Sequence, residues 1–275
     1  MGITLPTYDP TLFQGAAWYY AHYRSKYPQA LFDLLANAFK LDGKGRLLDL
    51  GCGAGLVGIP FASRFAEVVG LDPDADMLKE AEEQATIALI RNIRWIHDRA
   101  ESISEDLGKF QLVTMGRSFH WMQRELVLSK LDSLVVEDGA IVILKTNENV
   151  WESEHPWKKT VIEVVKRWLG ERRRTGQSGE GTWKRLEVSH EEILLKSPFS
   201  RLETYEVKSK QSWTIDSYLG YIYSTAFGLP SFFGENREKF ETDLGASLLA
   251  VEPSGEFTEE LPVTALVARR HLAKI

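Results

Sequence analysis

A short stretch near residue 50 combines an acidic side chain with closely spaced glycines. Asp49 is followed by Gly51, Gly53 and Gly55 in the segment LLDLGCGAG. Glycines at a turn let the backbone bend and let a ligand approach main-chain atoms that a side chain would otherwise cover. The residue types and their spacing therefore indicate a loop that binds a small molecule.

Glycine spacing alone leaves two ligands open. Residues 53–58, GAGLVG, satisfy the dinucleotide pattern G-x-G-x-x-G, and Asp72 stands near the distance expected of a carboxylate that binds ribose hydroxyls. Asp49 separates the alternatives, because like charges about 4 Å apart repel by roughly 4 kcal/mol at an effective dielectric of about 20. A pyrophosphate is disfavoured beside Asp49, whereas the sulfonium and ammonium groups of S-adenosylmethionine are favoured.

His120 is the candidate for acid–base chemistry. It follows an apolar run at 110–115 that is typical of a β-strand, and ligands of open α/β sheets bind beyond the carboxyl ends of the strands. An imidazole titrates near neutral pH and can remove a proton from an acceptor hydroxyl. Alternatively, His120 and Trp121 pack the mouth of the pocket and orient the ligand.

Strands and helices alternate through the first half of the chain, which would place these residues at one edge of a sheet. Apolar runs predict strands at 46–50, 67–71, 92–96, 110–115 and 139–146, and helical spacing predicts helices at 59–65, 75–90 and 126–136. Two further helices are expected before residue 40, with a break at Pro28, because proline disfavours the helical state of the preceding residue. Parallel neighbours need long crossovers, so the pattern predicts an α/β fold with a doubly wound, mostly parallel sheet.

The second half of the chain is less regular. Helices are predicted at 155–169, after Ser189, at 214–227 and at 235–249, and strands at 202–208 and 262–269. The chain shows no internal repeat and no linker rich in Pro, Gly or Ser. We therefore expect a single domain, 1–275, with a helical elaboration over one end of the sheet.

Two features of this second half each have two explanations. Residues 157–174 contain seven basic and two acidic side chains, which either attract an anionic substrate or form a solvated helix end. Aromatic residues at near-helical spacing either line an acceptor pocket or belong to the core. These are Trp213, Tyr218, Tyr221, Tyr223 and Phe227.

Composition excludes several classes of protein. The net charge of -6 and the pI of about 5.6 disfavour tight binding to phosphate backbones or anionic membranes. The longest apolar runs fall far short of the roughly 20 residues that span a bilayer. The single cysteine, Cys52, excludes an intrachain disulfide and fits a reducing compartment, and without a nearby histidine it is expected to be a buried filler. We expect a soluble, cytoplasmic protein with no nucleic-acid or membrane partner.

The segment LLDLGCGAG resembles the first motif of class I S-adenosylmethionine-dependent methyltransferases, and further motifs follow in order. Leu71-Asp72-Pro73 with Met77 resembles the second motif, whose acidic residue accepts both ribose hydroxyls. Residues 98–102, DRAES, resemble the segment that contacts adenine. Arg99 stands there in place of the usual Asp, which leaves the Ala100 backbone as the expected adenine contact.

Two more segments extend the resemblance. Residues 110–121 are similar to the fourth strand and the Ala-Phe-His-Trp turn of the type 11 branch, which includes trans-aconitate methyltransferases. Upstream, Tyr20 and Arg24 match a helix that closes over the methionine end of the donor, with Ser25 where the branch usually has proline. The motifs cover about residues 17–146.

The resemblance implies S-adenosyl-L-methionine as the methyl donor, no metal, and a seven-stranded sheet with a helical lid. It implies a cofactor-binding core at 1–146 and a substrate lid with a terminal β-hairpin at 147–275. The donor-binding residues implied are Tyr20, Arg24, Asp49, Gly51, Cys52, Gly53, Gly55, Asp72, Pro73, Met77, Arg99, Ala100, Glu101, Met115, Gly116 and Ser118.

The acceptor is expected to be a small molecule. Residues 116–119, GRSF, stand where enzymes that methylate adenine or glutamine carry Asn-Pro-Pro-Tyr. The acceptor atom is a carboxylate oxygen, which needs no base, or a hydroxyl oxygen, which needs His120 or a similar group. Two rival functions stay open at this point, a non-catalytic S-adenosylmethionine-binding protein and an NAD-dependent oxidoreductase.

Overall fold

The computed structural model describes residue 9 and residues 11–146, 150–171, 173–175, 179–181 and 188–271. Its main sheet contains β1 (Arg46–Leu50), β2 (Glu67–Asp72), β3 (Ile93–His97), β4 (Phe110–Gly116), β5 (Val135–Thr146), β8 (Arg201–Val207) and β11 (Val263–Arg269). All but β5 begin within one residue of the predicted start. β5 begins at Val135, which pairs with Phe110 across a register shift, rather than at Gly139.

The strands lie in the order β3-β2-β1-β4-β5-β11-β8. The neighbours from β3 to β5 are parallel, and β11 runs antiparallel to both β5 and β8. The mostly parallel, doubly wound sheet predicted from the sequence is therefore confirmed. Because β1 and β4 are adjacent and parallel, the loops that follow them emerge side by side at one edge of the sheet.

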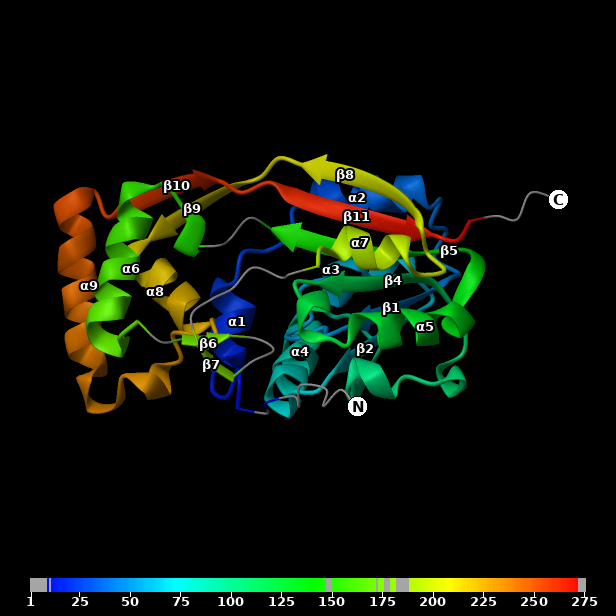
Figure 1. Ribbon diagram of the computed structural model, residues 1–275, viewed down its shortest axis with the longest axis horizontal. Helices are drawn as coiled ribbons and strands as arrows, with labels where there is room; N and C mark the ends of the chain where they lie inside the picture. The colour runs from blue at the N-terminus through cyan, green and yellow to red at the C-terminus, as the bar shows by residue number, and fades with distance from the viewer. Residues whose placement is uncertain are drawn as a thin grey trace.

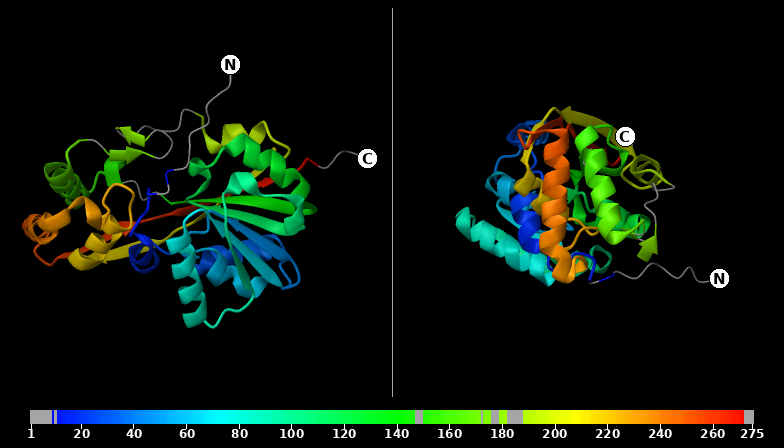
Figure 2. Two further views of the ribbon diagram at one scale, coloured as in Figure 1. Left: turned by 90° about the horizontal axis from the view of Figure 1, so that it is seen from below. Right: turned by 90° about the vertical axis from the view of Figure 1, so that its left-hand side faces the viewer.

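Helices cover both faces of the sheet, and further helices stand beyond one end of it. The α-helices of the described residues are α1 (Ala17–Tyr23), α2 (Gln29–Ala38), α3 (Gly58–Phe61), α4 (Ala75–Ile87), α5 (Arg124–Leu134), α6 (Pro156–Leu169), α7 (His190–Leu195), α8 (Ile215–Tyr223) and α9 (Arg237–Val251). Apolar residues of α2 and α3 pack on one face and those of α5 and α7 on the other (Figures 1 and 2). Among the described residues, none of these helices is both long and apolar enough to cross a lipid bilayer.

A second cluster of helices stands beyond one end of the sheet and is here called the lid. It contains α6, α8 and α9 with two strands, β9 (Lys210–Thr214) and β10 (Glu256–Glu260), at the left of Figure 1. β9 and β10 pair with each other as continuations of β8 and β11. Between the two pairs, the Leu261 N–H donates to the Ser209 carbonyl at 2.7 Å. The part of the lid from β9 to β10 is thus inserted between the two antiparallel strands β8 and β11, whereas α6 comes earlier in the chain, between β5 and β8. Another short ribbon pairs β6 (Arg173–Thr175) with β7 (Gly179–Gly181).

The lid has its own aromatic core, and this decides whether the aromatic residues at 213–227 line an acceptor pocket or belong to a core. Trp213, Tyr218, Tyr221 and Tyr223 are buried there, so these side chains are core residues of the lid. Phe227 packs at the edge of the same cluster.

The basic side chains of α6 pair with carboxylates. Buried Lys158 pairs with Glu259, which also accepts a hydrogen bond from the Trp213 indole at 2.9 Å. On the surface, Lys159 pairs with Glu154 and Arg167 with Asp243. Lys159 and Arg167 therefore favour the solvated-helix explanation, whereas Lys158 belongs to a buried ion pair. Arg172 and the side chains of Arg173 and Arg174 lie outside the described part of the chain.

Candidate functional site

The loop that follows β1 is fixed by hydrogen bonds to the end of β2. The N–H groups of Gly51 and Cys52 donate to the Leu71 carbonyl at 2.8 and 3.1 Å, and the Gly53 N–H donates to Asp72 Oδ2 at 2.8 Å. Burial beside carboxylates raises the pKa of the Cys52 thiol well above its ordinary value, which agrees with a filler and not with a nucleophile. Two predicted donor-binding segments, the glycine loop and Asp72, are thus in direct contact.

Three glycines of the loop occupy backbone conformations that other residues rarely adopt. The φ angles of Gly51, Gly53 and Gly55 are +64°, +51° and +80°. A Cβ on Gly51 would also lie 2.5 Å from Ser118 Cβ, whereas one on Gly53 would meet only the Tyr20 ring, at 3.6 Å. Gly53 therefore leaves its main chain accessible on the side where Tyr20 lies.

Asp49 lies beneath this loop and is fully buried. Its Oδ2 accepts the Gly58 N–H at 3.1 Å and its Oδ1 accepts the Thr114 hydroxyl at 2.8 Å. Burial, together with the charge of Asp72, raises its pKa from 3.8 to about 7. The carboxylate thus connects β1 to α3 and β4, and the role of Asp49 toward the donor stays a prediction.

Asp72 closes the loop from the other side. Besides the Gly53 N–H, it accepts the Asp74 N–H on Oδ1 at 3.0 Å. Burial raises its pKa to about 6. Each carboxylate oxygen has a further lone pair, so Asp72 has the capacity to accept two ribose hydroxyls while it holds the loop. The next residue, Pro73, offers its carbonyl to His97 Nε2 at 3.0 Å.

The segment that follows β3 lies next to Asp72 and contains the residues predicted to contact adenine. The Asp98 N–H donates to the Asp72 carbonyl at 3.2 Å. Arg99 Nε pairs with Glu101 at 3.3 Å, and Glu101 also accepts the Gln123 N–H at 2.8 Å. Both predicted side chains are therefore engaged with each other and with the start of α5. This leaves the main chain at Ala100 as the part that could contact a base.

Helix α1 packs onto the glycine loop. Ala17 and Ala21 are buried against Ala54 and against Met77 of α4, so Met77 has a packing role. This contact brings Tyr20 over the loop.

Two guanidinium groups lie close to the Tyr20 ring. Arg24 Cζ is 5.4 Å and Arg117 Cζ is 5.8 Å from the ring centroid. Tyr20 and Arg24, which the resemblance pairs at the methionine end, are thus brought together above Gly53.

The remaining predicted residues belong to the end of β4 and have structural reasons of their own. The Met115 side chain is fully buried in the core under α5, so only its main chain can contact a ligand. A Cβ on Gly116 would lie 2.9 Å from Tyr27 Oη, which requires glycine there. The Ser118 hydroxyl donates to the Leu50 carbonyl at 2.7 Å and so ties the β4 and β1 loops together.

His120 is partly buried beside Trp121, with ring centroids 4.8 Å apart. Burial, with smaller contributions from His190, Arg24 and Arg124, lowers its pKa from 6.5 to about 3. The imidazole is therefore neutral at physiological pH and too weak a base to deprotonate a hydroxyl efficiently. The structure favours the alternative in which His120 orients a ligand.

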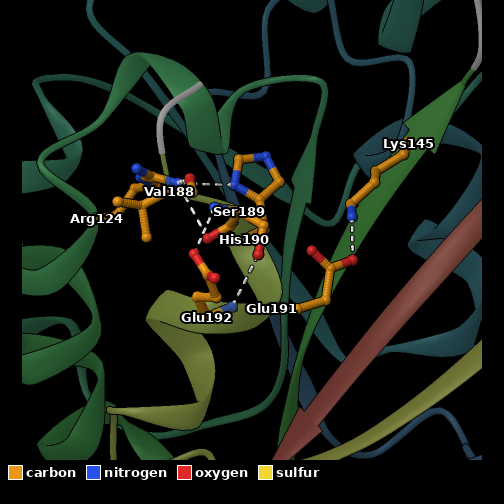
Figure 3. Close-up of polar contacts among 7 residues, drawn as sticks. All are labelled: Arg124, Lys145, Val188, Ser189, His190, Glu191 and Glu192. Atoms are coloured by element: carbon orange, nitrogen blue, oxygen red, sulfur yellow. Dashed lines mark hydrogen bonds and ion pairs between the residues drawn. The ribbon is translucent and has the colours of Figure 1, made fainter. Parts of the chain in front are cut away.

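Sequence reasoning did not single out Arg124 at the start of α5 and His190 at the start of α7, which Figure 3 shows side by side. Arg124 Nη1 donates to the Val188 carbonyl at 2.9 Å and to His190 Nδ1 at 3.3 Å, which assigns the neutral ring proton to Nε2. Close by, Lys145 Nζ at the end of β5 pairs with Glu191 at 2.5 Å. The sequence predicts the start of α7 from its capping box, Ser189 with Glu192. It contains no local pattern that shows α5 and α7 packing together.

Phe13 joins the donor loop to the region of His120. Its ring lies 6.2 Å from Tyr20 and 5.8 Å from Trp121, with edge-to-face geometry in both cases. The glycine loop, the α1 side chains and the residues after β4 are therefore linked by a continuous set of aromatic contacts.

A sheet in which only β11 opposes the other strands, with a glycine loop after β1 and an acidic residue at the end of β2, is the arrangement of class I methyltransferases. The protein is a class I S-adenosylmethionine-dependent methyltransferase. Residues 47–139, from β1 into β5, match the family described as "Methyltransferase domain".

Similar proteins agree with this class. A Dictyostelium discoideum protein named as a methyltransferase is 22% identical over 256 residues, which cover 90% of this chain and 88% of that protein. A Saccharomyces cerevisiae protein named as an S-adenosylmethionine-dependent methyltransferase is 31% identical over 124 residues, 43% of this chain and 42% of that protein. A methyltransferase structure from Anaeromyxobacter dehalogenans superimposes with a TM-score of 0.59 at 19% identity, covering 90% of this chain and 97% of the other, and supports the fold.

Proposed function

We propose that this enzyme transfers the donor methyl group to a carboxylate oxygen of a small anionic molecule. The observation that carries the proposal is the set of basic groups around His120. Arg24 approaches it from the end of α1 and Arg124 from the start of α5, and the positive charge of each lowers the pKa of the imidazole. His190 of α7 also lies close, but its own pKa is lowered to about 4 by burial, so it is neutral at physiological pH. A region that disfavours an additional positive charge favours an anion for the same electrostatic reason.

The chemistry of a carboxylate acceptor suits the residues around this region. A carboxylate is already ionised at neutral pH, so no side chain has to remove a proton, and the low basicity of His120 is no obstacle. Bound S-adenosylmethionine supplies an electrophilic methyl group on a positively charged sulfur. The acceptor oxygen forms the new bond to carbon as the bond from carbon to sulfur breaks, and the electron pair of that bond stays on sulfur.

The protein's own task is to align the two molecules and exclude water. An aligned pair at about 3 to 3.5 Å converts a bimolecular step into an effectively unimolecular one. We assign Asp72 to the ribose hydroxyls, Tyr20 and Arg24 to the methionine end, and the Ala100 main chain to adenine. The cytoplasmic location and the absence of a nucleic-acid partner, expected from composition, are part of the proposal.

The donor is tested first, by titrating the protein with S-adenosylmethionine and with NADH in separate calorimetric experiments. We expect S-adenosylmethionine to bind more tightly because Asp49 and Asp72 oppose a pyrophosphate at the glycine loop. Tighter binding of NADH would contradict the donor assignment.

The acceptor is tested by incubating the enzyme with methyl-labelled donor and a panel that pairs each carboxylic acid with its alcohol of the same skeleton. We expect labelled methyl esters from the acids. In the variant Arg124→Gln, the KM for the acid should rise about tenfold. The exposed Arg91 provides a matched control, since Arg91→Gln removes the same charge outside the site. Labelled ethers from the alcohols, with no esters, would show that the acceptor is a hydroxyl.

A further inference from the structure

Arg117 follows β4 in a backbone conformation that is unfavourable for a long side chain. Its φ is +56°, in the left-handed region, and its N–H continues the ladder to β5 by donating to the Leu144 carbonyl at 3.1 Å. Glycine or asparagine would occupy this position with less strain. The local turn therefore does not explain why an arginine is here.

The side chain of Arg117 reaches the connection between α1 and α2. Its Nη1 donates to the carbonyl of Ser25, a buried residue, at 3.1 Å. Its guanidinium carbon lies 5.0 Å from the Tyr27 ring centroid and 5.8 Å from that of Tyr20. The Arg117 side chain thus approaches the segment 20–27 at three residues, Tyr20, Ser25 and Tyr27.

This segment carries Tyr20 and Arg24 above the glycine loop. On its other side, α1 contacts the lid: the Tyr23 ring occupies the space where a Cβ of Gly220 would be, and Arg24 lies 5.1 Å from the Tyr221 ring centroid. Arg117 approaches the segment from the end of β4, the strand next to β1. It therefore ties the segment to the sheet.

We propose that Arg117 is a positioning residue that holds the segment 20–27 closed over the donor-binding loop and so sets the affinity for the methyl donor. The inference rests on the proposed donor site. Arg117 acts through Tyr20 and Ser25, not on the reacting atoms. Backbone strain at a functional site persists when the contact that it permits is useful there.

The test is the variant Arg117→Gly, which removes the side chain and relieves the backbone at the same time. We expect the thermal midpoint of the donor-free protein to be unchanged or higher, the Kd for S-adenosylmethionine to rise about tenfold, and kcat at saturating donor to change little. Arg117→Lys keeps one cation without the planar group and should give an intermediate Kd.

Leu89 provides a matched control, because it has φ of +59° and is exposed at the end of α4. Leu89→Gly should raise or preserve the thermal midpoint without changing donor affinity. Wild-type affinity in Arg117→Gly would overturn the inference while the proposed function stands. A lower thermal midpoint with equal loss of donor affinity and kcat would also overturn it, because it would indicate general loosening. Failure of the wild-type protein to bind S-adenosylmethionine would refute the proposed function itself.

Discussion

The substitution Asp49→Asn tests how the buried carboxylate beneath the loop affects folding. Asp49 is fully buried, and both of its oxygens accept hydrogen bonds, from Gly58 and Thr114. Asparagine has nearly the same shape but carries no charge and provides one acceptor oxygen instead of two. The variant therefore removes a titrating group and one hydrogen bond, and only the first effect depends on pH.

The size of the pH-dependent effect follows from the raised pKa of Asp49, about 7 in the folded protein against 3.8 for the ordinary carboxyl. A carboxyl with a higher pKa in the folded chain binds its proton more tightly when folded, so the free energy of unfolding falls as pH rises between these values. At about 1.4 kcal/mol per pH unit, wild type should lose about 2 to 3 kcal/mol between about pH 5 and about pH 8 from this group alone. The hydrogen bond lost in Asp49→Asn costs about 1 to 3 kcal/mol at every pH.

The assay is urea unfolding at a series of pH values, followed by the fluorescence of the eight tryptophans at constant ionic strength. We expect the stability of Asp49→Asn relative to wild type to improve by about 2 to 3 kcal/mol from about pH 5 to about pH 8. The exposed Asp138 is the control, and Asp138→Asn should follow wild type in parallel. Parallel curves for Asp49→Asn and wild type would refute the reasoning, because Asp49 would then titrate alike in the folded and unfolded chains.

Three further substitutions address the donor site, the acceptor site and the lid. Asp72→Ala should weaken S-adenosylmethionine binding by more than about tenfold in calorimetry, and an unchanged Kd would count against the ribose assignment. His120→Asn should lower kcat by less than about a hundredfold and leave the pH–rate profile near neutrality unchanged, since the imidazole is neutral there; a larger loss with an altered profile would restore His120 as the base. Glu259→Ala leaves Lys158 buried without its carboxylate and should cost about 3 to 5 kcal/mol in urea unfolding, whereas Glu259→Leu combined with Lys158→Met should recover much of that loss; equal losses would contradict the buried-pair argument.

The predicted elements that match the structure are those with a local cause. β1, β2 and β4 are mostly apolar because both faces of a central parallel strand are buried, and that pattern is visible without tertiary information. The strand β10, EFTEE, was missed because its inward residues are Phe257 and Glu259, and a buried glutamate is stable only with its Lys158 partner from α6. Its strand character depends on a contact far away in sequence.

The residues of the candidate site also divide into those with a local sequence pattern and those placed by tertiary packing. The glycine positions and Asp72 were predictable, because the turn conformation and the carboxylate at a strand end are local features. The positions of Arg124 and His190 beside His120 were not predictable, because they come from helices that meet only when α7 packs on the sheet next to α5.

The amino-acid sequence by itself determined the order of strands and helices, the donor loop and the class of chemistry, since each depends on residues close together along the chain. Only the tertiary structure decided which charges surround His120, that Asp49 lies beneath the loop, and that Arg117 reaches Ser25 across the site. Burial and long-range electrostatics depend on three-dimensional distance, and distance between remote segments is set by packing rather than by sequence separation.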